Sequence, residues 1–345
     1  MTLWLNRYKA RDTGIFFPSL PWCGKVAAVY TQAINILHPD NLLVSLIKNQ
    51  TQMTALSILV PSLFECNHAS IIKQGHRAAL KRGRMILSRV RIDLEESKSW
   101  EGCLLQEDVR SFHLRKLPFL REALLQEGKS GGFLALVSPD ARGLPLITRC
   151  SRALDMIVSG MDFGNNQTSA QTRTRASTRD SNKTGTPFAN RSPAQIPTRA
   201  SDRSGTQAIS GLSQLVGLGI GFTPSGDDFI SGVLLGERMA RLFMEMPAEV
   251  RQEPHMKYLP VNKEEIRAAL DKTSLGGKTL LWQALQGQFP CCLLRAARGL
   301  SKAKRFEDML DMVKEAVSHG ETSGTDALTG LLWYLEIAGS AEVKG

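Results

Sequence analysis

The sequence has no apolar run long enough to cross a membrane, and its first residues lack the hydrophobic stretch of a signal peptide. Six cysteines are present without C-x-x-C spacing, and the adjacent Cys291 and Cys292 form a poor zinc-binding pattern. We therefore expect reduced, mostly buried thiols in a cytoplasmic protein. With 345 residues, 42% of them hydrophobic, the chain is long enough for two domains and a sizeable core.

Aromatic residues are few as well, and the net charge of +10 raises the question of nucleic-acid binding. Proteins that bind single-stranded nucleic acid have aromatic residues interleaved with basic ones, and this chain does not. Residues 160–206 alone hold seven Lys or Arg and three Asp, so this one segment carries +4 of the charge. We therefore do not expect nucleic-acid binding.

A recognisable nucleophilic triad is also missing, because the six histidines are scattered and no Ser–His–Asp or Cys–His order can be argued. Residues 273–279 superficially resemble a phosphate-binding P-loop, but Lys272 occupies the position of its first glycine. His319 is the histidine that we consider as a catalytic acid or base, since it closely precedes a motif described below. The alternative is a structural histidine that caps a helix.

Hydrophobic periodicity predicts an α+β fold with a β-rich N-terminal half and a mainly α-helical C-terminal half. Residues 84–94 end in the apolar/polar alternation of a half-buried strand, whereas 280–300 and 305–318 have the pattern of amphipathic helices. From residue 164 to 207 the composition shifts to Thr, Ser, Asn, Arg, Gly and Pro, which cannot bury enough surface to offset the entropy of ordering. We predict a β-rich domain over 1–160, a disordered basic insertion over 161–207 and a helical domain over 208–345.

The stretch 217–236 concentrates the unusual chemistry of the chain. Gly219 and Gly221 alternate with apolar residues, so the backbone there can bend freely and approach another group closely. Thr223 followed by Pro224 is typical of a helix N-cap with proline at the first helical position. A glycine-rich turn that opens a helix presents backbone N–H groups and a partial positive charge, which suit an anion. The alternative is a buried helix with a tight entry turn.

The pattern occurs twice, since ten residues from Ser225 match ten from Ser323 in the form Ser-Gly-x-Asp-x-x-(Ser/Thr)-Gly-(Val/Leu)-Leu. In a helix the Asp and the second Gly are four residues apart, hence on one face. Two helices that cross at those glycines would bring their N-termini, with Asp228 and Asp326, to one place. The alternative is two unrelated packing seams of small residues.

A shared site of this kind assigns roles to the residues of both helix entries. Carboxylates beside an anion repel it. We therefore expect either a ligand with an anionic end and an amide end, or a bound Mg²⁺. The sequence does not specify which residues would bind the metal. The residues expected to bind the anionic substrate are Gly219, Gly221, Thr223, Ser225 and Gly226 with Thr322, Ser323 and Gly324. The residues expected to act in catalysis, or to contact the amide or a metal, are Asp227, Asp228, Asp326 and His319.

The sequence 219–229, taken with 320–330, resembles a bacterial family long described as a domain of unknown function, which includes AllH, a subunit of the oxamate carbamoyltransferase of allantoin breakdown. The resemblance runs from about Val26 to Ile337, interrupted by the insertion. It implies a part in converting oxalurate and phosphate to oxamate and carbamoyl phosphate in purine catabolism, together with partner subunits. The alternative is a non-catalytic subunit that binds a small acid or serves assembly.

Overall fold

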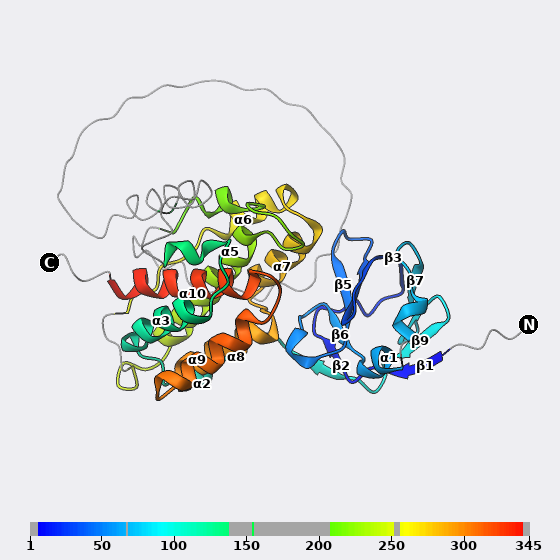
Figure 1. Ribbon diagram of the computed structural model, residues 1–345, viewed down its shortest axis with the longest axis horizontal. Coiled ribbons are helices and arrows are strands. Elements are labelled where there is room, and N and C mark those ends of the chain that lie inside the picture. Colours follow the sequence, from blue (N-terminus) through cyan, green and yellow to red (C-terminus); the bar gives the residue numbers. More distant parts are fainter. Residues whose placement is uncertain (1–5, 67, 138–153, 155–207, 252–255, 341–345) are drawn as a thin grey trace, which may run out of the picture.

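The chain consists of a β-sheet formed by its N-terminal part and a group of helices formed mainly by its C-terminal part (Figure 1). The predicted α+β fold, with a β-rich N-terminal half and a helical C-terminal half, is therefore confirmed. The computed structural model describes residues 6–66, 68–137, 154, 208–251 and 256–340. The predicted insertion, 161–207, lies outside the described residues.

Within the described residues, the strands form one mixed sheet in the order β1-β9-β8-β7-β3-β4-β5-β6-β2-β10. The strands are β1 (Asn6–Lys9), β2 (Asp12–Gly14), β3 (Trp22–Val29), β4 (Ala33–Leu37), β5 (Leu43–Ile47), β6 (Ser57–Leu59), β7 (Arg77–Lys81), β8 (Arg84–Leu87), β9 (Val90–Asp93) and β10 (Lys98–Trp100). A short helix, α1 (Pro61–Glu65), follows β6.

The sheet curls until its two ends meet. Strand β1 is followed closely by β2, and β9 is followed closely by β10. Strand β1 runs parallel to β9, and β2 runs parallel to β10. Because β2 also pairs with β6, this parallel ribbon joins both ends of the strand order. The enclosed core contains fully buried branched side chains such as Ile34, Ile36 and Ile92, which fit a pleated surface well.

The prediction of a single strand over 84–94 is wrong, because these residues form a hairpin. Strands β8 and β9 pair antiparallel, with Leu87 opposite Val90. Ser88 takes a φ of 52°, which reverses the chain between them. Apolar alternation identifies strand residues on both sides of such a turn, but no Gly or Asn marks the turn itself.

The helical part is built from α2 (Gln106–Val109), α3 (Leu117–Glu127), α5 (Ser225–Met244), α6 (Lys263–Ala269), α7 (Leu275–Leu285), α8 (Cys291–Lys302), α9 (Phe306–Val317) and α10 (Ser323–Ser340). The predicted single helix over 280–300 is two helices, since α7 ends before Gly287, which has a φ of 75°, and Pro290 caps α8. In the described part of the chain, no helix combines the length and apolar character needed to span a membrane.

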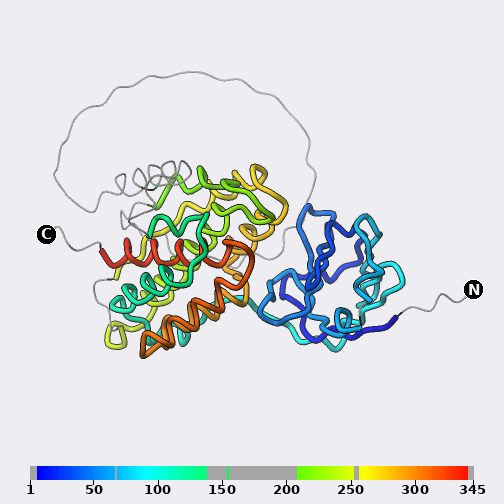
Figure 2. The backbone as a smooth tube through the Cα atoms, in the orientation of Figure 1, coloured from blue at the N-terminus to red at the C-terminus, as the bar shows by residue number. Residues whose placement is uncertain are grey.

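The core of the helical part includes residues that precede the boundary predicted near residue 160. Leu104, Phe112, Leu120 and Phe133 are buried in the same hydrophobic cluster as Phe229 of α5. The tube of Figure 2 shows α3 lying among the C-terminal helices. Where one domain ends and the next begins remains a prediction.

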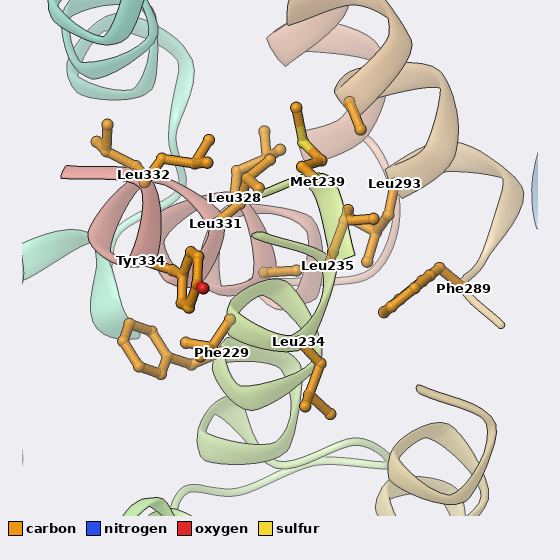
Figure 3. Close-up of a cluster of buried hydrophobic side chains, with 14 of the residues drawn as sticks. Phe229, Leu234, Leu235, Met239, Phe289, Leu293, Leu328, Leu331, Leu332 and Tyr334 are labelled. Atoms are coloured by element: carbon orange, nitrogen blue, oxygen red, sulfur yellow. The ribbon is translucent and has the colours of Figure 1, made fainter. Parts of the chain in front are cut away.

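Helices α5 and α10 cross at the centre of this cluster and make its most extensive helix contact. A Cβ atom at Gly232 would lie 1.8 Å from the carbonyl oxygen of Ala327, and one at Gly330 would lie 2.0 Å from that of Phe229. Leu331 and other large apolar side chains surround the crossing (Figure 3). The predicted crossing at the two motif glycines is therefore confirmed.

We predict that Gly232→Ala destabilises the protein although alanine favours helices. The added methyl group meets a backbone oxygen that cannot move alone, and such overpacking costs about 1–3 kcal/mol. Gly299→Ala in α8 is the matched control, because its Cβ meets only the flexible side chain of Met312. Urea unfolding should show a lower midpoint for Gly232→Ala and an unchanged or higher one for Gly299→Ala; equal midpoints would contradict the close crossing.

Candidate functional site

A cavity of about 320 Å³ lies between the sheet and the helices. Its volume is at the lower end of the range typical of sites for small molecules. Its walls are mostly apolar, with polar groups supplied by both parts of the chain. The sheet side contributes Leu43, Ser45, Thr51, Gln52 and Thr54, and the helical side contributes Phe222, Thr223, Asp228, Gly276, Thr279, Leu280, Gln283, Pro290, Cys292, Leu293, His319, Gly320, Ser323, Gly324 and Ala327.

Hydrogen bonds between the two parts hold the walls of the cavity together. The backbone N–H of Leu43 donates to Thr279 Oγ1 at 2.9 Å, and that of Leu56 donates to Gln283 Oε1 at 3.2 Å. The backbone of Met53 accepts from Cys291 N–H at 2.9 Å. No motif in the sequence predicted these contacts, because strand and helix residues carry no signal of their distant partners.

Four helices begin at the cavity: the lining includes residues at the N-terminal ends of α5, α7, α8 and α10. Figure 1 shows the N-terminal end of α10 directed toward the sheet. Each helix N-terminus carries about half a positive charge. No Lys or Arg is among the described residues that line the cavity, so these helix ends are the main source of positive charge there.

Several amides at these helix ends already have backbone partners. Gly226 N–H donates to Leu218 O at 2.8 Å, and Gly324 N–H donates to His319 O at 3.3 Å. A Cβ at Gly226 would also lie 2.0 Å from Leu215 O, so this glycine serves close packing. These two amides are therefore less available as direct N–H donors than the sequence indicated.

The two helix entries meet through their hydroxyl groups. Thr223 Oγ1 lies 3.0 Å from Ser323 Oγ, and Ser225 Oγ lies 3.5 Å from Thr322 Oγ1. Thr223 was expected to cap α5, but the helix starts one residue after Pro224, which leaves the Thr223 hydroxyl free to reach across. The hypothesis that the repeated motifs come together is therefore confirmed, while their role in binding remains a prediction.

Asp228 is the carboxyl group that lines the cavity. It is 5% exposed, and its Oδ2 accepts a hydrogen bond from Thr223 Oγ1 at 3.1 Å. Burial raises the pKa of Asp228 well above its ordinary value, and the nearby charges of Asp326 and Asp227 add to this, while hydrogen bonding from Ser323 and Thr223 offsets part of it. A neutral carboxyl group at this position would not repel an anion and could donate a hydrogen bond to it.

Asp326 occupies the equivalent place in the second motif but is not among the residues that line the cavity. Its Oδ1 accepts from the backbone N–H of Phe133 at 2.5 Å, and a Cβ at Gly132 would lie 2.1 Å from that oxygen. Burial raises the pKa of Asp326, and the Ser225 and Thr322 hydroxyls lie close enough to lower it in part. Among the described residues, no group makes a well-formed hydrogen bond to its buried Oδ2.

Asp227 faces away from the cavity and joins two loops. Its Oδ1 accepts from Gly217 N–H at 2.8 Å, and Oδ2 accepts a close hydrogen bond from Thr273 Oγ1. A Cβ at Gly277 would lie 1.9 Å from Oδ2, so the entry of α7 can approach only because of that glycine. Asp227 is therefore held by loop groups outside the cavity, and the catalytic role expected of it remains a prediction.

The remaining predicted residues divide between the cavity wall and its support. Gly219 and Gly221 have φ values of 111° and 122°, which glycine tolerates, and shape the loop before α5 without being among the lining residues. His319 lines the cavity and follows the end of α9. Its Nδ1 lies 3.0 Å from Glu315 O, and because a carbonyl only accepts, Nδ1 donates and Nε2 of the neutral ring is an acceptor.

Among the described residues, Asp228 is the single Asp or Glu that lines the cavity where Mg²⁺ was considered. The described residues contain no group of three or more His, Cys, Asp or Glu side chains that could hold a metal ion. We therefore derive no step that involves a metal.

We predict that Asp228→Asn stabilises the protein increasingly as the pH rises. A carboxyl group with a raised pKa in the folded state contributes stability below its ordinary pKa of 3.8 and loses it as the pH rises through the folded pKa. Each unit of upward shift costs about 1.4 kcal/mol at high pH, and asparagine removes that cost. Thermal unfolding at pH 5 and pH 8 should therefore show a larger gain in Tm at pH 8.

The matched control is Asp308→Asn, because backbone N–H groups of Lys304 and Arg305 and the Arg305 side chain lower the pKa of Asp308. This variant should lose stability at neutral pH. A Tm difference for Asp228→Asn that does not change with pH would show that this carboxyl group has an ordinary pKa.

Comparison with curated proteins and with solved structures returns no match. A family model does match, over a segment that contains both helix entries and the starts of the four helices at the cavity. This finding confirms the predicted resemblance for the helical part of the chain. Residues 215–335 match the family described as the oxamate carbamoyltransferase subunit AllH.

Proposed function

We propose that the chain is a subunit of an oxamate carbamoyltransferase-like enzyme of purine and allantoin catabolism, and that its cavity binds a small acid with an amide end. The observation that carries this proposal is the position of Asp228. Its side chain has a raised pKa, bonds to Thr223 and faces the cavity where four helices begin. The same segment matches the family of the transferase subunit.

The chemistry of oxamate and oxalurate suits the two kinds of polar group in the cavity. The ligand carboxylate is favoured by the helix N-termini, each worth about 0.3–1 kcal/mol when exposed and up to about 2 kcal/mol when partly buried. The amide end can exchange hydrogen bonds with Asp228 and with the hydroxyl of Ser323. The apolar walls, including Leu43 and Leu293, exclude water and strengthen these interactions.

In the proposed reaction, the ureido carbonyl carbon of oxalurate loses its bond to the oxamate nitrogen and gains a bond to a phosphate oxygen. The departing nitrogen takes up one proton, and hydrogen phosphate supplies one. Protonated Asp228 can donate that proton at the cavity and be reprotonated by the phosphate. His319 Nε2 is the second group able to relay it.

Phosphate binding is the part of this reaction that the cavity supports least. A dianion needs more positive charge than helix ends provide, and no Lys or Arg lines the cavity among the described residues. We therefore propose that a partner subunit supplies the cationic groups, in keeping with the word subunit in the family description. The chain alone is then expected to bind oxamate without turnover.

The proposal predicts that oxamate binding weakens as the pH rises, because the anion prefers protonated Asp228. Isothermal titration of the purified chain should show affinity falling through the raised pKa of that group. Asp228→Asn, which mimics the neutral carboxyl, should bind oxamate with little pH dependence but give no turnover when the partner subunits are added. Asp40→Asn, an exposed control, should behave as the wild type.

Two outcomes would contradict this account. One is the absence of binding of oxamate and oxalurate at millimolar concentration, and the other is full turnover by Asp228→Asn with its partners.

A non-catalytic assembly subunit is the second candidate, and one surface feature favours it. Ile220 is 95% exposed in the loop before α5, and the half-exposed rings of Phe222 and Tyr30 add to the apolar surface of this region. The neighbouring Phe222 lines the cavity and contacts Tyr30 of the sheet part edge-on. A partner subunit that covers this loop would bury Ile220 and close the cavity.

Ile220→Ser separates the two candidates. If the loop serves only assembly, the variant should fail to co-elute with its partner subunits in gel filtration, and the chain should not bind oxamate in titration. If the cavity binds the acid as we propose, oxamate binding by the isolated variant should match that of the wild type. Leu20→Ser, another exposed apolar position, is the control for solubility.

A further inference from the structure

A second hollow, of about 740 Å³, lies where the chain turns from α8 to α9. Among the described residues, no Asp or Glu lines this hollow. Six basic residues do: His113, Arg115, Lys116, Lys302, Lys304 and Arg305. The first cavity touches the opposite end of α8, at Cys292 and Leu293. With about 1.5 Å of rise per residue along α8, the two sites are well separated. We call this hollow the basic groove.

The positive charge of the basic groove is largely uncompensated. Lys116 Nζ donates to the backbone oxygens of Ser111 at 3.0 Å and Ser301 at 2.5 Å, so its partners are carbonyls. Burial lowers the pKa of Lys116, and the charge of Arg115 lowers it further. The groove has five Lys and Arg side chains. Within the described residues, one of them forms an ion pair: Arg305 lies 3.2 Å from Asp308.

Apart from Ser111 and Ser301, the rest of the groove lining is apolar. Phe119 is 46% exposed there, and its ring packs edge-on against that of Phe306 at a centroid distance of 6.2 Å. Ala303 and Met309 also line the groove. A half-exposed ring held by a second ring is a platform on which another aromatic ring can stack.

We propose that the basic groove binds a nucleoside polyphosphate, with the phosphates against Arg115, Lys302 and Lys304 and the base on Phe119. The several cations match the several negative charges of a polyphosphate, and the apolar surface matches a base. Compactness favours a small molecule over an acidic peptide, which needs an extended groove. Because no carboxylate lines the groove, the metal-free nucleotide binds better than its magnesium complex.

The test is isothermal titration of the full chain with ATP in the presence of EDTA. The expected result is micromolar binding that weakens as salt is raised, because phosphate contacts are screened. The double variant Lys302→Ala/Lys304→Ala should bind at least about tenfold more weakly, the loss expected for two phosphate contacts. The control Lys73→Ala/Lys81→Ala removes the same charge from exposed positions in the sheet part and should bind as the wild type.

Two further titrations separate the groove's aromatic platform from its charge and from the first cavity. Tripolyphosphate should bind more weakly than ATP to the wild type, and Phe119→Ala should reduce ATP binding to the level of tripolyphosphate. Asp228→Asn should bind ATP normally, since its cavity lies at the far end of α8. The proposal is overturned by no binding of ATP at millimolar concentration, by equal losses in both double variants, or by equal affinity of the wild type for ATP and tripolyphosphate.

Discussion

The close crossing of α5 and α10 is the constraint on which the rest of the candidate site depends. Gly232 and Gly330 let each helix backbone approach the carbonyl oxygens of the other, to distances that any side chain would prevent. Because the motif repeats with the same spacing from Asp to Gly, a crossing at the glycines also places the helix starts together. Hydroxyl contacts between Thr223 and Ser323 follow from that geometry.

Burying carboxyl groups at this crossing is costly, and the structure compensates for it unevenly. Asp227 has both oxygens bonded to neighbouring loops, and Asp326 has one oxygen bonded to the Phe133 amide. Asp228 keeps contact with the cavity, and burial raises its pKa well above the ordinary value. The stability cost of this carboxyl group therefore rises with pH.

Much of the central architecture could be predicted from the sequence, because it rests on local rules. The repeat placed Asp228 four residues before Gly232, which is enough to predict a shared face and a crossing. The residues that these side chains contact could not be predicted. The hydrogen bonds of Asp326 with Phe133, and of Thr279 with Leu43, join residues far apart in the chain. The same limit applies to Asp227, whose loop partners Gly217 and Thr273 could not be predicted from the sequence.

The sequence prediction also missed two breaks, one of which is marked by Gly and Pro and one of which is not. Apolar periodicity continues from α7 into α8, so Gly287 and Pro290 were passed over as the end of one helix and the start of another. Ser88, by contrast, adopts a left-handed conformation without being Gly or Asn, so no local residue marks that turn. In both places the periodic pattern gives the correct class of element with the wrong boundary.

A crystal structure of the chain with oxamate bound tests the central claim most directly. We expect oxamate in the cavity between the sheet and the helices, with its amide within hydrogen-bonding distance of Asp228 and its carboxylate toward the starts of α5 and α10. Oxamate bound elsewhere, or bound in the cavity without contact to Asp228 or Ser323, would contradict a site shared by the two motifs.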